Sequence, residues 1–144
     1  MIYTEMTKKA MKIAYDAHAG QEDKCGTPYI FHPMHLAEQM ESEDTCTVAL
    51  LHDVVEDTQL SIADLKALGF PKGITDAILL LTHDKSEPYL DYVKRVRINP
   101  AARAVKLADL KHNSDTSRLE SVDEKTIERI AKYRRAIEIL EANT

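Results

Sequence analysis

The chain has 144 residues, of which 44% are hydrophobic and 30% charged, and its formal net charge is −5. A chain of this length and composition fits one globular domain with one hydrophobic core, so we expect a single domain over residues 1–144. The acidic balance argues against a binder of nucleic acid polymers, which needs a basic surplus to neutralise phosphates, although a local cluster of Lys and Arg can still hold one small anion.

Hydrophobic residues recur with the helical period along the chain, and no window alternates with the two-residue period of a strand. The first helix is expected to present an apolar face made of Met6, Ala10, Ile13, Ala14 and Ala17. A loop over residues 20–31 should follow it. After this loop we expect a short helix from His32 to about Met40 and another from about Thr45 to Glu56.

Cap and turn signals predict the helices of the middle of the chain. Ser61 and Asp64 have the spacing of a capping box, and Gly69 has the position of a residue that ends the same helix. Apolar residues at helical spacing mark two further helices, one over residues 74–81 and one over residues 89–96.

Signals for the N-termini of two more helices complete the predicted bundle. Asn99 followed by Pro100 is typical of a cap with proline at the first helical position, and Ser121 with Glu124 predicts a second capping box before the last helix. The predicted fold class is therefore all-α, a compact helical bundle of about eight helices.

The chain carries no signal for export or membrane insertion. No apolar run approaches the roughly 18 residues of a membrane-spanning helix, and the N-terminus lacks the apolar segment of a secretory signal. The two cysteines, Cys25 and Cys46, are too few for a disulfide framework and form no close-spaced metal motif. We expect a cytoplasmic protein with free thiols and no membrane partner.

The most informative segment is an apolar run, residues 49–57, which contains four titratable side chains. These are His52, Asp53, Glu56 and Asp57. Burying an unpaired carboxylate costs several kcal/mol or more, and adjacent carboxylates repel one another, so a divalent metal ion is the simplest partner. On one continuous helix, His52 and Glu56 would share a face and Asp53 and Asp57 the adjacent face. One face can then hold ligands while its neighbour presents acid/base groups.

Two residues outside this run extend the candidate metal site. Asp109 lies among small and apolar residues, and His32 begins a helix directly after a proline-containing loop. A single buried histidine is more often a hydrogen-bonded core residue, but together with His52 and Asp53 the set offers two imidazoles and two carboxylates. Such a set suits Mn²⁺, Fe²⁺, Zn²⁺ or Mg²⁺ better than Ca²⁺ or a thiophilic metal. It also leaves room for water, which a bound divalent cation acidifies.

Three motifs occur in order along the chain: Gly26-Thr27-Pro28-Tyr29-Ile30-Phe31-His32-Pro33, Ala49-Leu50-Leu51-His52-Asp53-Val54-Val55-Glu56-Asp57-Thr58 and Lys106-Leu107-Ala108-Asp109-Leu110-Lys111-His112-Asn113. With them the chain resembles the HD-domain hydrolase of the RelA/SpoT homologues, which removes the 3′-pyrophosphate of the alarmone (p)ppGpp. It is most similar to the small, hydrolase-only type. The resemblance covers nearly the whole chain and is more specific for the HD fold and the metal site than for the substrate.

The resemblance also assigns roles within the candidate site. It implies a Mn²⁺ cofactor with four ligands, namely His32, His52, Asp53 and Asp109. It further implies that Glu56 and Asp57 act beside the metal, where they orient water and handle protons. Taken alone, these two acids could be ordinary residues at a helix C-terminus, but the helix dipole disfavours anions there, which supports the catalytic interpretation.

Substrate contacts follow from the same resemblance. Asn113 matches a residue near the nucleotide sugar, and Arg129 and Tyr133 match residues that reach the phosphates. The alternatives are a helix C-cap for Asn113, and a solvated Arg and a packed Tyr on an amphipathic helix. Full-length members carry an arginine that packs on guanine, whereas this chain has Asp23 followed by Lys24. A lysine cannot replace the flat guanidinium, so we expect weak discrimination between guanine and adenine, with Lys24 as a candidate phosphate contact or else a solvated cation.

The leading hypothesis is thus a metal-dependent phosphohydrolase that removes pyrophosphate from a small nucleotide of the (p)ppGpp type. One alternative is an HD hydrolase of another phosphorylated nucleotide, and a second is a non-enzymatic module that binds metal and nucleotide. The acids Glu56 and Asp57 argue against the module. A dinuclear-iron HD oxygenase needs extra histidines between the His-Asp pair and Asp109, and only His83 lies in that interval.

Overall fold

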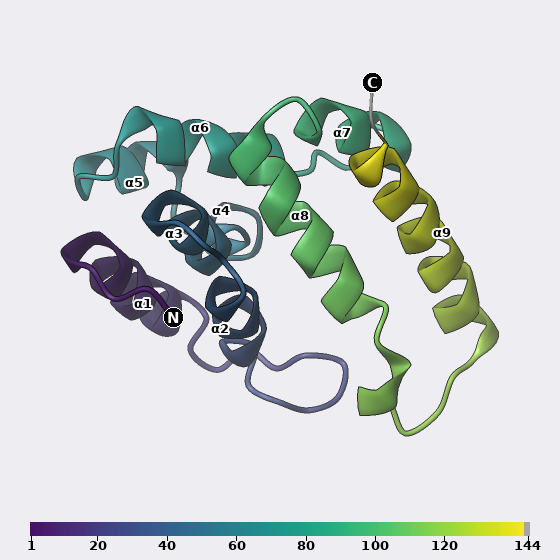
Figure 1. The fold of residues 1–144 in the computed structure, drawn as a ribbon. Helices are drawn as coiled ribbons and strands as arrows, with labels where there is room; N and C mark the ends of the chain where they lie inside the picture. The colour runs from purple at the N-terminus through teal and green to yellow at the C-terminus, as the bar shows by residue number, and fades with distance from the viewer. Residues whose placement is uncertain (143–144) are drawn as a thin grey trace.

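A computed structural model describes residues 1–142, which form nine α-helices and one short 3-10 helix, with one isolated β-bridge and no strand (Figure 1). The helices are α1 (Glu5–Ala17), α2 (Phe31–Glu38), α3 (Glu43–Leu51), α4 (Val54–Asp57), α5 (Ile62–Ala67), α6 (Lys72–Leu81), α7 (Tyr89–Val96), α8 (Pro100–Asn113), η1 (Thr116–Arg118) and α9 (Glu124–Glu141). The expected all-α bundle is confirmed. The ninth helix arises because the expected helix over Thr45–Glu56 is broken in two.

Helix α3 forms the centre of the bundle. It packs against α1, α2, α6 and α8, while α9 covers α8 and α7 from the other side (Figure 1). All residues from Cys46 to Leu51 are buried, as expected of a helix that is surrounded by others. The core therefore encloses the end of α3, at which the His52-Asp53 pair is placed.

Most of the predicted helix caps are present. The Ser61 side chain accepts a hydrogen bond from the Asp64 amide while Asp64 bonds back to the Ser61 amide, which is the expected capping box. Gly69 ends this helix with a φ of 96°, in the left-handed region that favours glycine. The Asn99 side chain caps α8 by accepting a hydrogen bond from the Ala102 amide at 3.0 Å.

The predicted cap of the last helix is wrong. The N-cap of α9 is Asp123, and its carboxylate accepts a hydrogen bond from the Thr126 amide at 2.8 Å. Ser121 lies outside the helix, and Glu124 is its first residue. A carboxylate at this position satisfies a free amide and also interacts favourably with the positive end of the helix dipole.

The prediction of one helix over Thr45–Glu56 is also wrong. Helix α3 ends at Leu51, and α4 begins at Val54. Nδ1 of His52 lies 2.6 Å from the Ala49 carbonyl oxygen, so the side chain takes part in the hydrogen bonding of the last turn of α3. Asp53, with a φ of −103° and a ψ of 0°, begins a new turn. His52 and Asp53 are therefore not constrained to adjacent faces of one helix.

Within residues 1–142, no helix is both long enough and apolar enough to cross a membrane. Cys46 is buried beside the N-terminal segment and Cys25 is exposed in the loop before α2, and both thiols are free.

Candidate active site

Three predicted ligands from three helices converge at the centre of the bundle. The imidazoles of His32, at the start of α2, and His52, after α3, lie beside the carboxylate of Asp109 on α8, and one ligand atom of each lies within 4.8 Å of the others. Nε2 of His32 is 2.8 Å from Oδ1 of Asp109, and Nε2 of His52 is 3.7 Å from the same oxygen. All three side chains are buried.

His52 supplies the clearest sign that the cluster can bind a cation. Its Nδ1 faces the Ala49 carbonyl oxygen and must carry a proton to bond with it. In a neutral ring, Nε2 then bears a lone pair, yet this atom points at Oδ2 of Asp53 at 3.0 Å and is buried without a hydrogen bond. A lone pair that faces two carboxylates is unfavourable unless a proton or a metal ion lies between them.

The charges around His52 agree with this interpretation. Burial alone would lower the pKa of His52, but the carboxylates of Asp53 and Asp109 outweigh it and raise the pKa well above its ordinary value. The site therefore draws a positive charge to Nε2. The pairs His32–Asp109, His52–Asp53 and His52–Asp109 bring their donor atoms to 2.8–3.7 Å, close to the separation of about 3 Å between neighbouring ligands of a divalent cation bound at about 2.1 Å. Asp53 adjoins the other three predicted ligands through His52 and groups more closely with Glu56 and Asp57.

Asp53 joins this cluster to the two candidate catalytic acids. Oδ2 of Asp53 accepts a hydrogen bond from the Tyr29 hydroxyl, and burial raises the pKa of Tyr29, which keeps it protonated. Carboxylate oxygens of Asp53, Glu56 and Asp57 lie within 4.8 Å of one another. Asp53, at the break between α3 and α4, thus adjoins both His52 and the two candidate acids.

Asp109 is held from its other side by two residues of its own helix. Nζ of Lys106 lies 2.9 Å from Oδ2, and Nδ2 of Asn113 donates to Oδ1 at 3.0 Å. Burial would raise the pKa of Asp109, but Lys106 and the two imidazoles hold it well below its usual value. Asn113 is the last residue of α8, and it acts through its side chain on Asp109 and not as the helix C-cap, which is Ser114.

His112 orients His32. Nδ1 of the two rings are 2.7 Å apart, and the rings stack with an interplanar angle of 14°. Burial and then the nearby charges, His32 first, lower the pKa of His112 to about 4, so its ring is neutral. A neutral His112 that accepts the Nδ1 proton of His32 leaves Nε2 of His32 with its lone pair directed at the cluster.

The cluster forms one wall of an inner cavity of about 260 Å³. The candidate acids Glu56 and Asp57 line it together with Lys106, Tyr89 and Tyr133. The hydroxyl of Tyr89 is buried and has no hydrogen-bond partner, although two lysines, Lys106 and Lys132, lie over its ring. The cavity therefore combines a carboxylate-rich side with a side that carries cations and a free hydroxyl.

The two acids differ in their surroundings. Oε1 of Glu56 accepts a hydrogen bond from the His83 amide at 2.6 Å, which fixes this side chain, while Nε2 of His83 donates to the Glu87 carbonyl oxygen at 2.8 Å. Burial, followed by repulsion from Asp53 and Glu56, raises the pKa of Asp57 to about 6. A bound cation would lower this pKa again, because it stabilises the carboxylate.

The predicted substrate residues surround a second, outer cavity of about 320 Å³. Its lining includes Lys24, Asn113, Arg129 and Tyr133, and it shares Tyr29, Asn113 and Tyr133 with the inner cavity. Lys24 and Arg129 both line this cavity, and burial, followed by the charge of Arg129, lowers the pKa of Lys24. Because the two cavities share three lining residues, they form one cleft that leads from the acidic cluster to an outer cavity lined by three acids and three cations.

The sequence of the chain is related to known (p)ppGpp enzymes. SpoT, the bifunctional (p)ppGpp synthase/hydrolase of Escherichia coli strain K12, is 33% identical over 124 residues, 76% of this chain and 18% of SpoT. Human guanosine-3′,5′-bis(diphosphate) 3′-pyrophosphohydrolase MESH1 is 35% identical over 105 residues, 65% of this chain and 58% of MESH1. Over most of its length the chain is therefore homologous in sequence to a part of these RelA/SpoT enzymes. No protein-family model matches it.

Two further comparisons bear on this RelA/SpoT homologue. A probable guanosine-3′,5′-bis(diphosphate) 3′-pyrophosphohydrolase of Synechocystis is 33% identical over 138 residues, 86% of this chain and 18% of that protein. The homologue thus spans about a fifth of the length of its bacterial relatives. A solved structure of a metazoan SpoT orthologue that hydrolyses ppGpp matches with a TM-score of 0.77 at 22% identity, over 99% of this chain and 89% of that one. It shares the fold.

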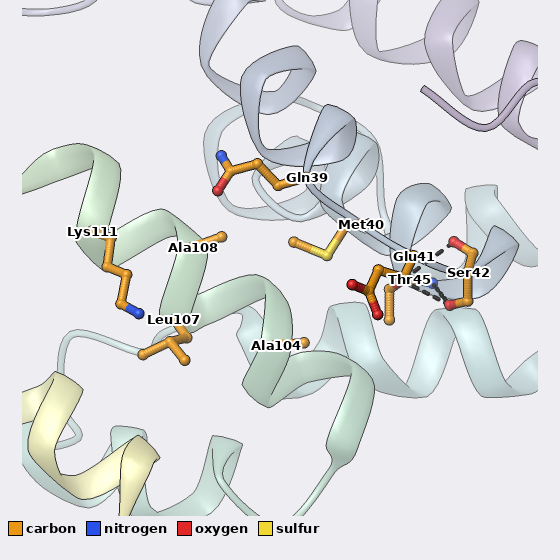
Figure 2. A pocket seen from close by; sticks show the side chains of 9 residues that line it. All are labelled: Gln39, Met40, Glu41, Ser42, Thr45, Ala104, Leu107, Ala108 and Lys111. Carbon is orange, nitrogen blue, oxygen red and sulfur yellow. Dashed lines mark hydrogen bonds between the residues drawn. The ribbon is translucent and has the colours of Figure 1, made fainter.

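The RelA/SpoT homologue also has a third hollow, which lies away from all predicted site residues. Figure 2 shows this open groove of about 510 Å³ between α8 and the segment that joins α2 to α3. Its lining is largely apolar, with Met40, Ala104 and Leu107 beside one cation, Lys111. Lys111 is itself paired with Glu141 at 3.1 Å. Without a metal-ligating cluster, the groove lacks the chemistry of the central cleft.

Several functional contacts of the RelA/SpoT homologue were missed in the sequence. Lys106 has a signal that could have found it, because it lies three residues before Asp109 on one helix face. Tyr29 belongs to the first motif, but its contact with Asp53 joins residues 24 apart. Tyr89 and Arg118 stand in segments without a motif, and only the fold brings them to the cleft.

Proposed function

We propose that this RelA/SpoT homologue is a metal-dependent phosphohydrolase that removes pyrophosphate from a nucleotide of the (p)ppGpp type, and that residues 1–144 form this one domain. The observation that carries the proposal is the buried, unpartnered Nε2 of His52, which faces the carboxylates of Asp53 and Asp109 in the wall of a cavity. Relatives that are 33% and 35% identical are named guanosine-3′,5′-bis(diphosphate) 3′-pyrophosphohydrolases, which supports the choice of reaction and substrate.

The resident cofactor in this proposal is one divalent cation, with Mn²⁺ as the first candidate. Four residues would hold it: His32, His52, Asp53 and Asp109. Bound there, a divalent cation acidifies water and withdraws charge from a phosphoryl oxygen. Second contacts keep the donors in place, because the Ala49 carbonyl orients His52 and Lys106 pairs with the far oxygen of Asp109.

The acids Glu56 and Asp57 would manage the proton and the attacking water. Glu56 is fixed through Oε1 by the His83 amide, so it is suited to orient a water molecule in the cavity. Asp57 lines the same cavity with a carboxylate oxygen within 4.8 Å of Asp53 and Glu56, so it is suited to accept a proton and to return it to the leaving oxygen. The bound cation would lower its pKa from about 6. Neither residue is needed as a ligand in this scheme.

Cations at the cleft would bind the phosphates. Arg129 and Lys24 line the outer cavity, and Lys106 lies deeper, where its charge is stabilised beside Asp109. Asn113 and Tyr133 line both cavities, which places them between the reacting group and the rest of the nucleotide. Developing negative charge on phosphate is offset by such preorganised groups.

The test is a turnover screen of purified, Mn²⁺-loaded protein against ppGpp, its adenine analogue, GTP and nucleoside monophosphates. We expect GDP and pyrophosphate as the products from ppGpp. Turnover of another nucleotide but not of ppGpp would support the hydrolase activity and contradict the proposed substrate. Tight binding of metal and nucleotide without any turnover would contradict the hydrolase and favour the binding module.

A further inference from the structure

The outer cavity contains an arginine to which no role has been given. Arg118, the last residue of η1, reaches across the cavity to the loop before α2, where Nη1 lies 3.3 Å from Oδ2 of Asp23. Its Nη2 also donates to the His112 carbonyl oxygen at 3.4 Å. These contacts hold a planar guanidinium in the lining of the cavity that Lys24 and Arg129 also line.

Asp23 is a fixed anchor for this guanidinium. Its Oδ1 accepts hydrogen bonds from the amides of Cys25 at 2.8 Å and Thr27 at 3.0 Å, which close the loop around Gly26. Gly26 has a φ of 78°, in the region that favours glycine, so the loop geometry is well determined. Oδ2 remains for Arg118. An arginine introduced at position 23 would therefore lose the loop contacts and repel Arg118.

The charges in the cavity divide its cations into two kinds. Within residues 1–142, Lys24 and Arg129 form no ion pair, so their charges are available to phosphate. Arg118 is already paired with a carboxylate, and its side chain is 34% exposed. A neutralised guanidinium loses less hydration when a flat group covers it, and its plane is suited to stack on a heterocycle.

We propose that Arg118, oriented by Asp23, is the platform on which the base of the nucleotide stacks. The inference rests on the proposed function for the nature of the ligand. It assigns the base to the outer cavity, with the phosphates directed past Lys24 and Arg129 to the inner one. Because Asp23 and the His112 carbonyl oxygen engage Nη1 and Nη2 of Arg118, its face rather than its donor edge is offered to the base. Every base has a face that can stack, so the platform binds guanine and adenine with similar strength.

The experiment compares Arg118→Ala, Arg118→Lys and the control Arg135→Ala, an exposed arginine of α9 that lines neither cavity. Calorimetric titration with GDP, ADP and inorganic pyrophosphate measures binding, and steady-state kinetics with ppGpp separate KM from kcat. Thermal unfolding checks that each variant is folded. Lysine keeps the charge and the pairing with Asp23 but removes the plane.

We expect both Arg118 variants to bind GDP and ADP roughly tenfold more weakly, by equal factors, with pyrophosphate binding unchanged. KM for ppGpp should rise by a similar factor while kcat stays within about twofold. The Arg135→Ala control should match the wild type.

Three results overturn the platform. If Arg118→Lys binds GDP normally, the residue only holds the loop through its charge. If the variants lose pyrophosphate binding as much as GDP binding, Arg118 contacts phosphate instead of the base. If the wild-type protein binds neither GDP nor ADP, the cavity is no base site. If the wild-type protein does not hydrolyse ppGpp but the Arg118 variants still bind GDP more weakly than it does, the proposed function is overturned and the base platform stands.

Discussion

The inner and outer cavities of the cleft are built in different ways. The inner one is walled by residues of packed helices, and its donors His32, His52 and Asp109 are buried and held by second contacts. The outer one is formed by the loop before α2, by η1 and by one face of α9, with exposed Lys24 and Arg118. In the proposed function, the chemistry lies on packed helices and the selection of the ligand on loops, a division common in enzymes.

This contrast predicts where a mutation acts. A change in the inner cavity should affect stability, metal binding and turnover together, because its charges are desolvated and depend on one another. A change in the outer cavity should affect KM with little effect on stability, since the charges there are screened by water.

The largest effect is expected from Asp109→Ala. It removes a ligand and leaves Lys106 buried without its partner, which costs about 3–5 kcal/mol of stability. We expect loss of bound metal and of turnover, measured by metal analysis and by pyrophosphate release, with a lower melting temperature. The double variant Lys106→Met/Asp109→Ala should recover much of the stability and none of the turnover. Metal binding by Asp109→Ala at the wild-type level would contradict the ligand assignment.

The next effect concerns the acids beside the cluster. Glu56→Gln and Asp57→Asn should each keep the metal and the fold but lose turnover by about 10²-fold or more, within the range for a general acid or base. Asp76→Asn, an exposed carboxylate paired with Lys72 on α6, is the matched control and should be silent. Wild-type turnover in both variants would contradict an acid/base role for Glu56 and Asp57. Loss of bound metal in either variant would show that the residue is a metal ligand.

Metal removal should have a smaller but general effect on stability. A cation that binds only the native state adds about 2.7 kcal/mol at a hundredfold excess over its dissociation constant. Chelation should therefore lower the melting temperature, Mn²⁺ should restore it, and Mn²⁺ should leave the melting temperature of Asp109→Ala unchanged. Differential scanning calorimetry at fixed protein concentration makes this comparison, and equal melting temperatures with and without metal would count against a site in the core.

The smallest effect is expected in the outer cavity. Lys24→Ala and Arg129→Ala should each raise KM for ppGpp by up to about tenfold, equivalent to ~1.4 kcal/mol, because each removes one cation from the lining of the outer cavity, where water screens its charge. The increase should diminish at high salt. Lys125→Ala, an exposed lysine that lines neither cavity, provides the control. A large fall in kcat in either variant would place that residue in the chemical step.

The inner site was predictable because its signal is local. Titratable residues in apolar runs, such as His52-Asp53 and Asp109, are costly unless a cation is bound, and this cost can be inferred from the sequence. The helix break was not predictable in the same way, since it depends on the Ala49 carbonyl that His52 contacts and on partners on α2 and α8. Propensity alone favoured one helix, and tertiary contacts overrode it.

The outer site was less predictable because its parts lie far apart in the chain. Asp23 and Arg118 are 95 residues apart, and nothing in the sequence around either residue indicates that they form a pair. The sequence showed that the arginine expected near position 23 is absent, but only the fold shows a guanidinium supplied from η1. The wrongly assigned cap at Ser121 has a different cause, since Ser121 and Asp123 are both acceptable caps and local chemistry does not separate them.

The central claim is that a cation bound at His32, His52, Asp53 and Asp109 drives release of pyrophosphate from ppGpp. The direct measurement is a titration of metal-free protein with Mn²⁺, in which bound metal per chain and the rate of pyrophosphate release are followed in the same samples. The account predicts no release without metal and a rate that rises in proportion to occupancy, up to about one ion per chain. Full release of pyrophosphate by the metal-free protein, or full occupancy without release, would contradict it.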